Sequence, residues 1–261
     1  MAGQDGGLNR MVRNLLFTIE YDGSDFYGWQ RQPNVPTVQG VLEEVLSKIC
    51  NMPIAIHGTS RTDAGVHALG QRASFSGDFG IPTDRILFAT NNMLPPSICI
   101  TAVEEVPADF HARFNAKGKT YRYKIKNTSK RNVFDRNYVY YVAAPLKVEA
   151  MAEAAEHLVG THDFKCFQAT GGPEKTTTVR TITEMKVQQD GDEITIDVTG
   201  DGFLYNMVRI IVGTLVQVGL GKISPNQIPG IIQSKDRSKA GQTAPPQGLY
   251  LVQVHYEDLK K

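Results

Sequence analysis

One carboxylate, Asp63, stands in a loop of small residues beside a basic side chain, Arg61. The loop runs GTSRTDAGVHALGQ from Gly58 to Gln71, and its glycines permit backbone conformations that branched residues avoid. Its threonine, serine and alanine side chains leave room for another molecule to approach closely. By itself, an Asp-Ala-Gly loop is more often an ordinary turn capped by the Asp side chain. These residues alone therefore allow either a turn or a pocket wall that carries a nucleophile.

The whole string resembles the catalytic loop of the TruA family of tRNA pseudouridine synthases. The signature of that family is G-x-G-R-T-D-A-G-V-H, with the Asp as nucleophile, and Ser60 stands where its second glycine usually is. The resemblance covers most of the chain, because four further stretches match in the family's order: YDGSDFYGWQRQPNVPTVQGVLEEVL from Tyr21, DFHARFNAKGKTYRY from Asp109, GFLYNMVRIIVGTL from Gly202 and APPQGLYLVQVHY from Ala244.

The resemblance implies an isomerase that converts uridine to pseudouridine in the anticodon stem-loop, at tRNA positions 38, 39 or 40. Asp63 would attack C6 of the uracil or C1′ of the ribose, or stabilise a glycal, and the sequence leaves these three routes open. A stacked uridine hides its glycosidic bond, so the nucleotide must be extruded, and Arg61 is placed to brace the vacated space and contact phosphate. Without the resemblance Arg61 would be a surface arginine.

Three residues outside the loop complete the expected site. Tyr121 would be a core aromatic by its spacing alone, but the family has its active-site tyrosine here, stacked on the uracil and available for proton transfer at C5. Arg209 lies among apolar residues, where an unpaired guanidinium costs several kcal/mol. The resemblance implies that Arg209 pairs with Asp63, whereas a salt bridge elsewhere or exposure of its tip to solvent is the alternative. Leu249, otherwise a core leucine, resembles the family's apolar pocket residue.

The charge of the chain is unevenly distributed. The net charge is only +1, but residues 110–137 carry nine basic side chains and one acid, a local charge of +8 against −7 for the remainder. Such segregation favours a site for a polyanion over a merely solvated face. We therefore predict tRNA as the partner, with backbone contacts from Lys119, Arg122, Lys124 and Lys126.

Cofactor and metal motifs are absent from the sequence. There is no GxGxxG, P-loop or HExxH, and neither the three cysteines nor the six histidines have metal-ligand spacing. We therefore expect no metal and no small-molecule cofactor. The opening residues lack the apolar run of a signal peptide, and polar residues interrupt the apolar segment Phe203–Leu220, which predicts a buried helix, no membrane span and a cytoplasmic protein.

Hydrophobic periodicity predicts strands alternating with helices in two similar halves, an α+β architecture. The resemblance implies more: two ferredoxin-like halves, one continuous mixed, mainly antiparallel sheet with flanking helices, a central cleft and a homodimer. We predict a flexible tail at 1–10, an N-terminal half at 11–107 and a C-terminal half at 108–261. The expected strands are Leu15–Tyr21, Pro53–Ile56, Gln71–Ser76, Ile98–Val106, Tyr121–Ile125, Tyr138–Val142, Thr181–Gln188, Glu193–Thr199 and Gly248–Tyr256, and the expected helices are Val38–Ile49, Asp84–Met93, Val148–Val159 and Leu204–Leu215.

Two other functions are compatible with parts of the sequence. An RNA-binding module without chemistry would need the basic run, but it would not need Asp63, Tyr121 and Arg209 together. A glycoside hydrolase would need two carboxylates flanking the scissile bond. The Asp63 loop offers only one carboxylate, so the pseudouridine synthase is the favoured interpretation.

Overall fold

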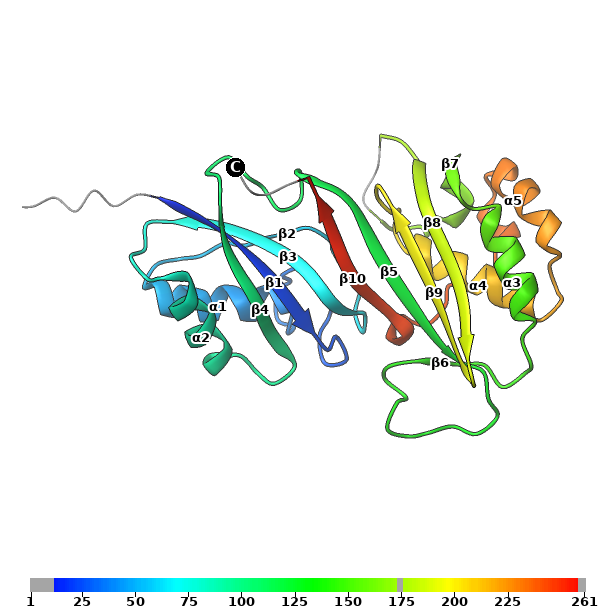
Figure 1. Ribbon diagram of the computed structural model, residues 1–261, viewed down its shortest axis with the longest axis horizontal. Helices are drawn as coiled ribbons and strands as arrows, with labels where there is room; N and C mark the ends of the chain where they lie inside the picture. The colour runs from blue at the N-terminus through cyan, green and yellow to red at the C-terminus, as the bar shows by residue number, and fades with distance from the viewer. Residues whose placement is uncertain (1–11, 173–175, 258–261) are drawn as a thin grey trace, which may run out of the picture.

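A single twisted sheet crosses the whole molecule (Figure 1). The structure, a computed structural model, describes residues 12–172 and 176–257. Within them the strand order is β4-β1-β3-β10-β5-β9-β8-β7, with β2 beside β3 and β6 beside β5. The predicted tail at 1–10 lies outside the described residues. The strands are β1 (Arg13–Tyr21), β2 (His57–Gly58), β3 (His67–Gly77), β4 (Ile98–Val106), β5 (Ala116–Lys126), β6 (Tyr140–Tyr141), β7 (Gly160–Asp163), β8 (Val179–Asp190), β9 (Glu193–Gly200) and β10 (Leu249–Tyr256).

Two β-α-β-β-α-β units build this sheet. In the first, β2 pairs with β3, giving the order β4-β1-β3-β2, and in the second the order is β10-β5-β9-β8. Both orders are those of a ferredoxin-like unit, so the predicted α+β class with two such halves is confirmed. The α-helices are α1 (Val38–Cys50) and α2 (Thr83–Met93) in the first unit, and α3 (Val148–Glu156), α4 (Met207–Gly219) and α5 (Ile228–Ser234) in the second.

The two units join through β3 and β10, which run parallel. Tyr250 pairs with His67 and Leu251 with Ala68, while the β1–β3 and β10–β5 pairs on either side are antiparallel. β10 can pair here because β2 has only two residues and covers β3 only at Ala73 and Ser74. The division of the chain at residue 107 separates β4 from β5 and stays a prediction.

The predicted strand at Pro53–Ile56 is wrong, since this segment is irregular and the strand begins at His57. Its backbone groups bond to helix side chains instead of a ladder: the amide of Ile54 donates to Ser47 Oγ (2.9 Å) and that of Ile56 to Glu43 Oε1 (3.1 Å). Side chains that satisfy backbone donors compete directly with strand pairing.

Other elements follow the predicted pattern with shifted ends. Strand β4 and helix α2 lie within one residue of expectation, α3 ends earlier than expected at Glu156, and β6 keeps only two of the five residues expected at Tyr138–Val142. Helix α5 was not anticipated, because its seven residues include a proline and a glycine. No helix among the described residues has the length and apolar character needed to cross a bilayer.

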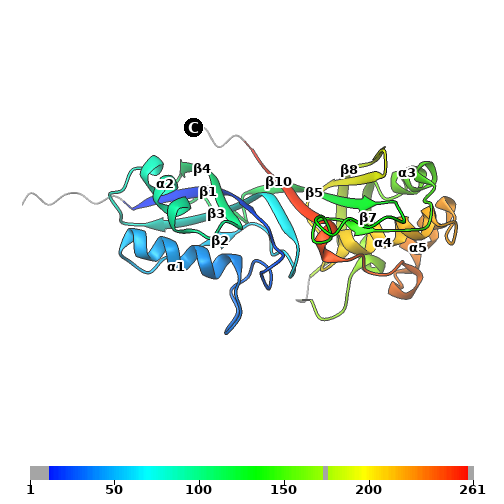
Figure 2. The same ribbon diagram turned by 90° about the horizontal axis from the view of Figure 1, so that it is seen from below.

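Helix α4 is the buried helix expected from Phe203–Leu220. Figure 2 shows α1 and α4 against the same side of the sheet, one in each half. A later segment packs directly on the α4 backbone: the amide of Gly241 donates to Thr214 Oγ1 (2.8 Å), and a Cβ added at Gly213 would lie 1.7 Å from the carbonyl oxygen of Gln242. This close approach fixes the segment that carries Ala244, an Arg209 partner.

We expect Gly213→Ala to lower the free energy of unfolding by about 3 kcal/mol, because the added methyl group overlaps a backbone atom that cannot move independently. Gly230→Ala is the matched control, since a Cβ at that position in α5 meets nothing within 4 Å. It should leave stability unchanged or raise it by up to about 1 kcal/mol. Urea unfolding of both variants measures this, and equal stabilities would show that α4 and the Gly241–Ala244 segment can separate without cost.

Candidate active site

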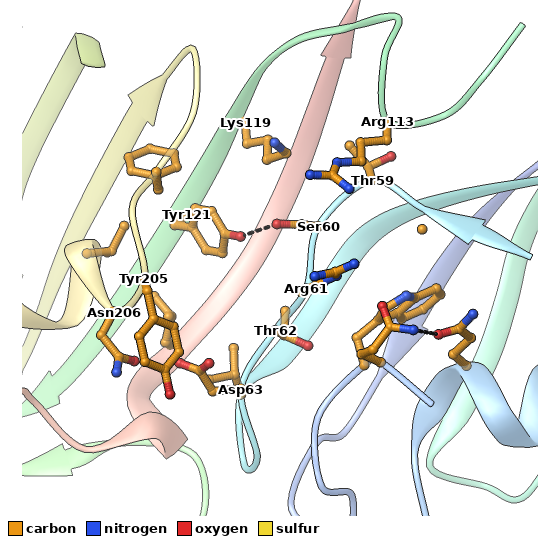
Figure 3. Close-up of a pocket in the computed structure, with 18 of the residues that line it drawn as sticks. Thr59, Ser60, Arg61, Thr62, Asp63, Arg113, Lys119, Tyr121, Tyr205 and Asn206 are labelled. Atoms are coloured by element: carbon orange, nitrogen blue, oxygen red, sulfur yellow. Dashed lines mark hydrogen bonds between the residues drawn. The ribbon is translucent and has the colours of Figure 1, made fainter. Parts of the chain in front are cut away.

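A cavity of about 970 Å³ lies between the two halves and contains Asp63. The Asp63 loop forms one wall, and β5 together with the start of α4 forms the other, as Figure 3 shows. The expected site residues Asp63, Arg61, Tyr121, Arg209 and Leu249 all line this cavity. Residues far apart in the chain thus meet as the sequence predicted.

The Asp63 loop is held by bonds to the first half. The amide of Val66 donates to the carbonyl of Asp63 (3.1 Å), and Gly65 between them has a φ of +77°, which is typical of a type II turn. On the other side of Asp63, the amide of Trp29 donates to the carbonyl of Thr62 (3.1 Å), and the Thr62 hydroxyl shares a hydrogen bond of 2.7 Å with Tyr21. The backbone on both sides of Asp63 is therefore fixed, while the Asp63 side chain remains 29% exposed.

Arg209 reaches Asp63 from the first turn of α4. Its Nη1 lies 3.1 Å from Asp63 Oδ2, and the arginine side chain is 15% exposed. The same Nη1 donates to Asn206 Oδ1 (2.8 Å), and Nε donates to the carbonyl of Ala244 (2.8 Å). Asn206 directly precedes the helix with a φ of 58°, in the left-handed region that Asn tolerates, and its side chain accepts from Arg209 rather than from the helix amides. Two other acceptors, Ala244 and Asn206, thus orient the guanidinium towards the Asp63 carboxylate, and a lysine could not replace this fork.

Tyr121 enters the cavity from β5 and is 7% exposed. Its hydroxyl shares a hydrogen bond of 2.7 Å with Ser60, and its ring meets Phe203 edge to face at a centroid distance of 5.2 Å. Burial raises the pKa of the Tyr121 phenol to about 12, the Ser60 hydrogen bond opposes the shift, and the charge of Asp63 adds to it. The phenol therefore keeps its proton at neutral pH and can donate a hydrogen bond.

The four basic residues predicted to contact RNA lie on different faces of β5. Lys119 shares the face of Tyr121 and lines the cavity. Arg122, Lys124 and Lys126 alternate with these residues and lie on the opposite face of the sheet. The structure therefore does not bring these three residues to the cavity.

Each of the three has a partner on that opposite face. Arg122 donates to both Asp197 carboxylate oxygens at 2.8 Å, and Lys126 donates to Asp192 Oδ1 at 2.7 Å. Lys124 Nζ lies 5.2 Å from the centre of the Tyr250 ring. The run of positive charge in the sequence is thus partly neutralised by acids of the neighbouring β9 hairpin.

The sequence reasoning missed several residues that line the cavity. Ser60 was treated only as a departure from the family signature, yet it is the hydrogen-bond partner of Tyr121. Nothing in the sequence points to Asn206 as an acceptor for Arg209, and Arg113 has no signal beyond its charge. Among the described residues, no group of three or more His, Cys, Asp or Glu side chains could hold a metal ion.

Comparisons with known proteins agree with this geometry. The sequence profile of a family described as tRNA pseudouridine synthase matches residues 17–115 and 154–257. This chain belongs to that family. As a member, it is an isomerase that acts on tRNA and forms pseudouridine from uridine.

Its relatives match over almost the whole chain. The tRNA pseudouridine synthase A of Acetivibrio thermocellus is 49% identical and that of Ruminiclostridium cellulolyticum 52% identical, each over 94% of this chain and 100% of the relative. A solved structure titled "Structure of H/ACA RNP bound to a substrate RNA containing 2'-deoxyuridine" is 10% identical, with a TM-score of 0.35 over 78% of this chain and 44% of that chain. So low a TM-score leaves the assignment to the family match.

We expect Asp63 and Arg209 to be coupled in stability by about 1 kcal/mol, less than a fully buried pair, because both side chains keep some exposure. Arg209→Ala should destabilise the fold more than Asp63→Asn, since the arginine also bonds to Ala244 and Asn206. Urea unfolding of both single variants and the double variant gives the coupling. Strict additivity would contradict the pair in solution.

Proposed function

We propose that Asp63 is the nucleophile of the isomerisation and that the substrate uridines lie in the anticodon stem-loop of tRNA. The observation that carries the first part is the Asp63–Arg209 pair, an oriented carboxylate inside a cavity large enough for a nucleotide. The charge-assisted hydrogen bond from Arg209 holds the carboxylate in one orientation, as attack on a bound nucleotide requires. The anticodon position rests on the family resemblance.

The reaction requires no net oxidation or reduction. The C1′–N1 bond breaks, the base turns and C1′ joins C5, after which C5 loses its hydrogen as a proton and N1, now free of the ribose, takes up a proton. Attack at C6, attack at C1′ and stabilisation of a glycal all use the same carboxylate, which is free again at the end. A bound cofactor has no step to perform in this sequence.

The neighbouring side chains have complementary roles in the proposal. Tyr121 presents a buried phenol on the cavity wall, which suits stacking on the extruded uracil. To accept the proton that leaves C5, the phenol must first give up its own proton, for example through the hydrogen bond to Ser60. Leu249 contributes an apolar wall. Arg61 is exposed at the cavity and braces the RNA from which the uridine has been extruded.

We also propose that RNA approaches the face of β5 that carries Tyr121. Lys119 and Arg61 line the cavity on that face, whereas Arg122, Lys124 and Lys126 lie on the other one. On that other face Arg122 pairs with Asp197 and Lys126 pairs with Asp192. Of the basic residues predicted to contact the RNA backbone, the proposal therefore keeps those on the face near Asp63.

The resemblance to the family also supports two further proposals, assembly as a homodimer and a place in the cytoplasm. Sedimentation velocity at micromolar concentration tests the first, since a sharp monomer boundary would contradict it. Fractionation of cells that express the tagged chain tests the second. Neither outcome changes the assignment of Asp63.

Asp63→Asn should abolish release of tritium from tRNA labelled at C5 of uridine while leaving tRNA binding within about a factor of three, because an amide keeps the shape but is no useful nucleophile. Asp84→Asn, an exposed acid at the start of α2, is the matched control and should release tritium at the wild-type rate. Activity of Asp63→Asn would contradict the nucleophile. A wild-type protein that binds tRNA without releasing tritium would instead support a non-catalytic RNA-binding module.

Two double variants, each lacking two positive charges, should show which face of β5 contacts the RNA. Lys119→Gln with Arg61→Gln should flatten the dependence of tRNA affinity on salt by about 0.7 to 0.9 log unit per lost phosphate contact. Lys124→Gln with Lys126→Gln should leave the slope unchanged, because these residues lie on the opposite face. Filter binding across a series of salt concentrations measures both slopes. The reverse result would place the RNA on the face opposite the cavity.

A further inference from the structure

Three aromatic rings form a stack on the rim of the Asp63 cavity. The rings of His57 and His111 are 4.9 Å apart and inclined by 29°, and those of His111 and Phe114 are 4.3 Å apart and inclined by 37°. The Arg113 guanidinium lies 5.8 Å from the centre of the Phe114 ring. All four residues line the cavity. We call His57, His111 and Phe114 the rim stack.

The rim stack is anchored to the Asp63 loop. Ala112 lies between His111 and Phe114 in the chain and is fully buried. Its amide donates to Ser74 Oγ (3.0 Å). Its carbonyl accepts from Thr59 Oγ1 (3.0 Å) and from the Tyr256 hydroxyl (2.7 Å). Figure 3 shows Thr59 and Arg113 close together at one end of the cavity. Because Thr59 belongs to the loop that carries Asp63, the rings keep a fixed position relative to the carboxylate.

Hydrogen bonds also fix the orientation of the His111 ring. Its Nδ1 accepts from the amide of Arg113 (3.1 Å), and Asn115 closes the loop by accepting from the His111 amide (2.8 Å) and donating to the His111 carbonyl (3.1 Å). Burial lowers the pKa of His111, and the neighbouring His57 lowers it further. The ring is therefore neutral at pH 7 and stays in a stacking geometry rather than repelling His57.

The outer ring of the rim stack is open to solvent. Phe114 is 76% exposed although its backbone is tied to a buried anchor. Phe114 packs against His111 and the Arg113 guanidinium and lines the cavity, so the rim stack offers an aromatic surface at the cavity on which a further flat ring can stack. The surrounding charges are Arg113 and Lys119, both on the same cavity, so the occupant should be flat, aromatic and negatively charged.

We propose that the rim stack binds an unpaired base of the RNA next to the extruded uridine. The proposal rests on the proposed function and adds to it a second nucleotide subsite. Bases of single-stranded RNA stack on aromatic and guanidinium planes, and this contact tolerates any base because every base has a π face. Stacking of the neighbouring base on the rim stack compensates for the base stacking that is lost when the uridine leaves the RNA helix. The enzyme should therefore prefer uridines whose neighbour can also unstack.

Fluorescence of 2-aminopurine placed on either side of the target uridine tests the subsite directly. Bound to Asp63→Asn protein, which holds the RNA without turnover, one of the two labelled tRNAs should be quenched by stacking. The quenching should disappear when Phe114→Ala is added and persist with Phe114→Trp. Phe88→Ala, which removes a ring of similar exposure (68%) from α2, should leave it intact.

Steady-state kinetics of the otherwise wild-type chain provide the second measurement. Phe114→Ala should raise KM for tRNA at least about fivefold, the effect of one lost base stack, with little change in kcat. Phe114→Trp should restore KM. An unchanged KM together with unchanged quenching would overturn the subsite while wild-type tritium release upholds the proposed function. Absence of tritium release from wild type would sink the proposed function, and the quenching would still report on the rim stack.

Discussion

The ion pair between Asp63 and Arg209 connects the two halves of the molecule. Asp63 comes from the first ferredoxin-like unit and Arg209 from α4 of the second, and their side-chain atoms meet at 3.1 Å. Both side chains are partly removed from solvent, so each is stabilised by the opposite charge of the other. The relative position of the two halves is thus linked to the geometry of the site. The Ala244 carbonyl and Asn206 complete the guanidinium's acceptors and extend this constraint into the packing around α4.

Much of the fold could be predicted because local patterns agree with the final contacts. The predicted strand Ile98–Val106 has the observed ends, and the predicted helix Asp84–Met93 differs from α2 by one residue. The prediction failed at Pro53–Ile56, where the backbone bonds to Ser47 and Glu43 of α1. Strand periodicity shows only which residues are apolar. It does not show that the amides of Ile54 and Ile56 find acceptors on side chains of the preceding helix.

The site shows a similar limit. Asp63, Tyr121 and Arg209 converge as expected, because motifs of a known family identify them and the fold brings them to one cavity. The basic residues of β5 were grouped by sequence, although a strand sends neighbours to opposite faces. Lys119 and Lys124 therefore lie on different surfaces, and the acids that neutralise Arg122 and Lys126 come from β9 and its turn. The charge of a segment cannot be assigned to one surface until strand register and partners are known.

The position of β10 affects how the chain reaches its native state. β10 follows every other described strand in chain order, yet it lies between β3 and β5 at the centre of the sheet. During synthesis on the ribosome, the first unit can form while the inner edge of β3 still has open hydrogen-bonding groups. An unpaired edge is a template for pairing with other chains. Only when β10 arrives is the edge closed, and the same event brings Leu249 to the cavity wall. Protection of the β3 edge from aggregation and assembly of the site thus depend on the same strand.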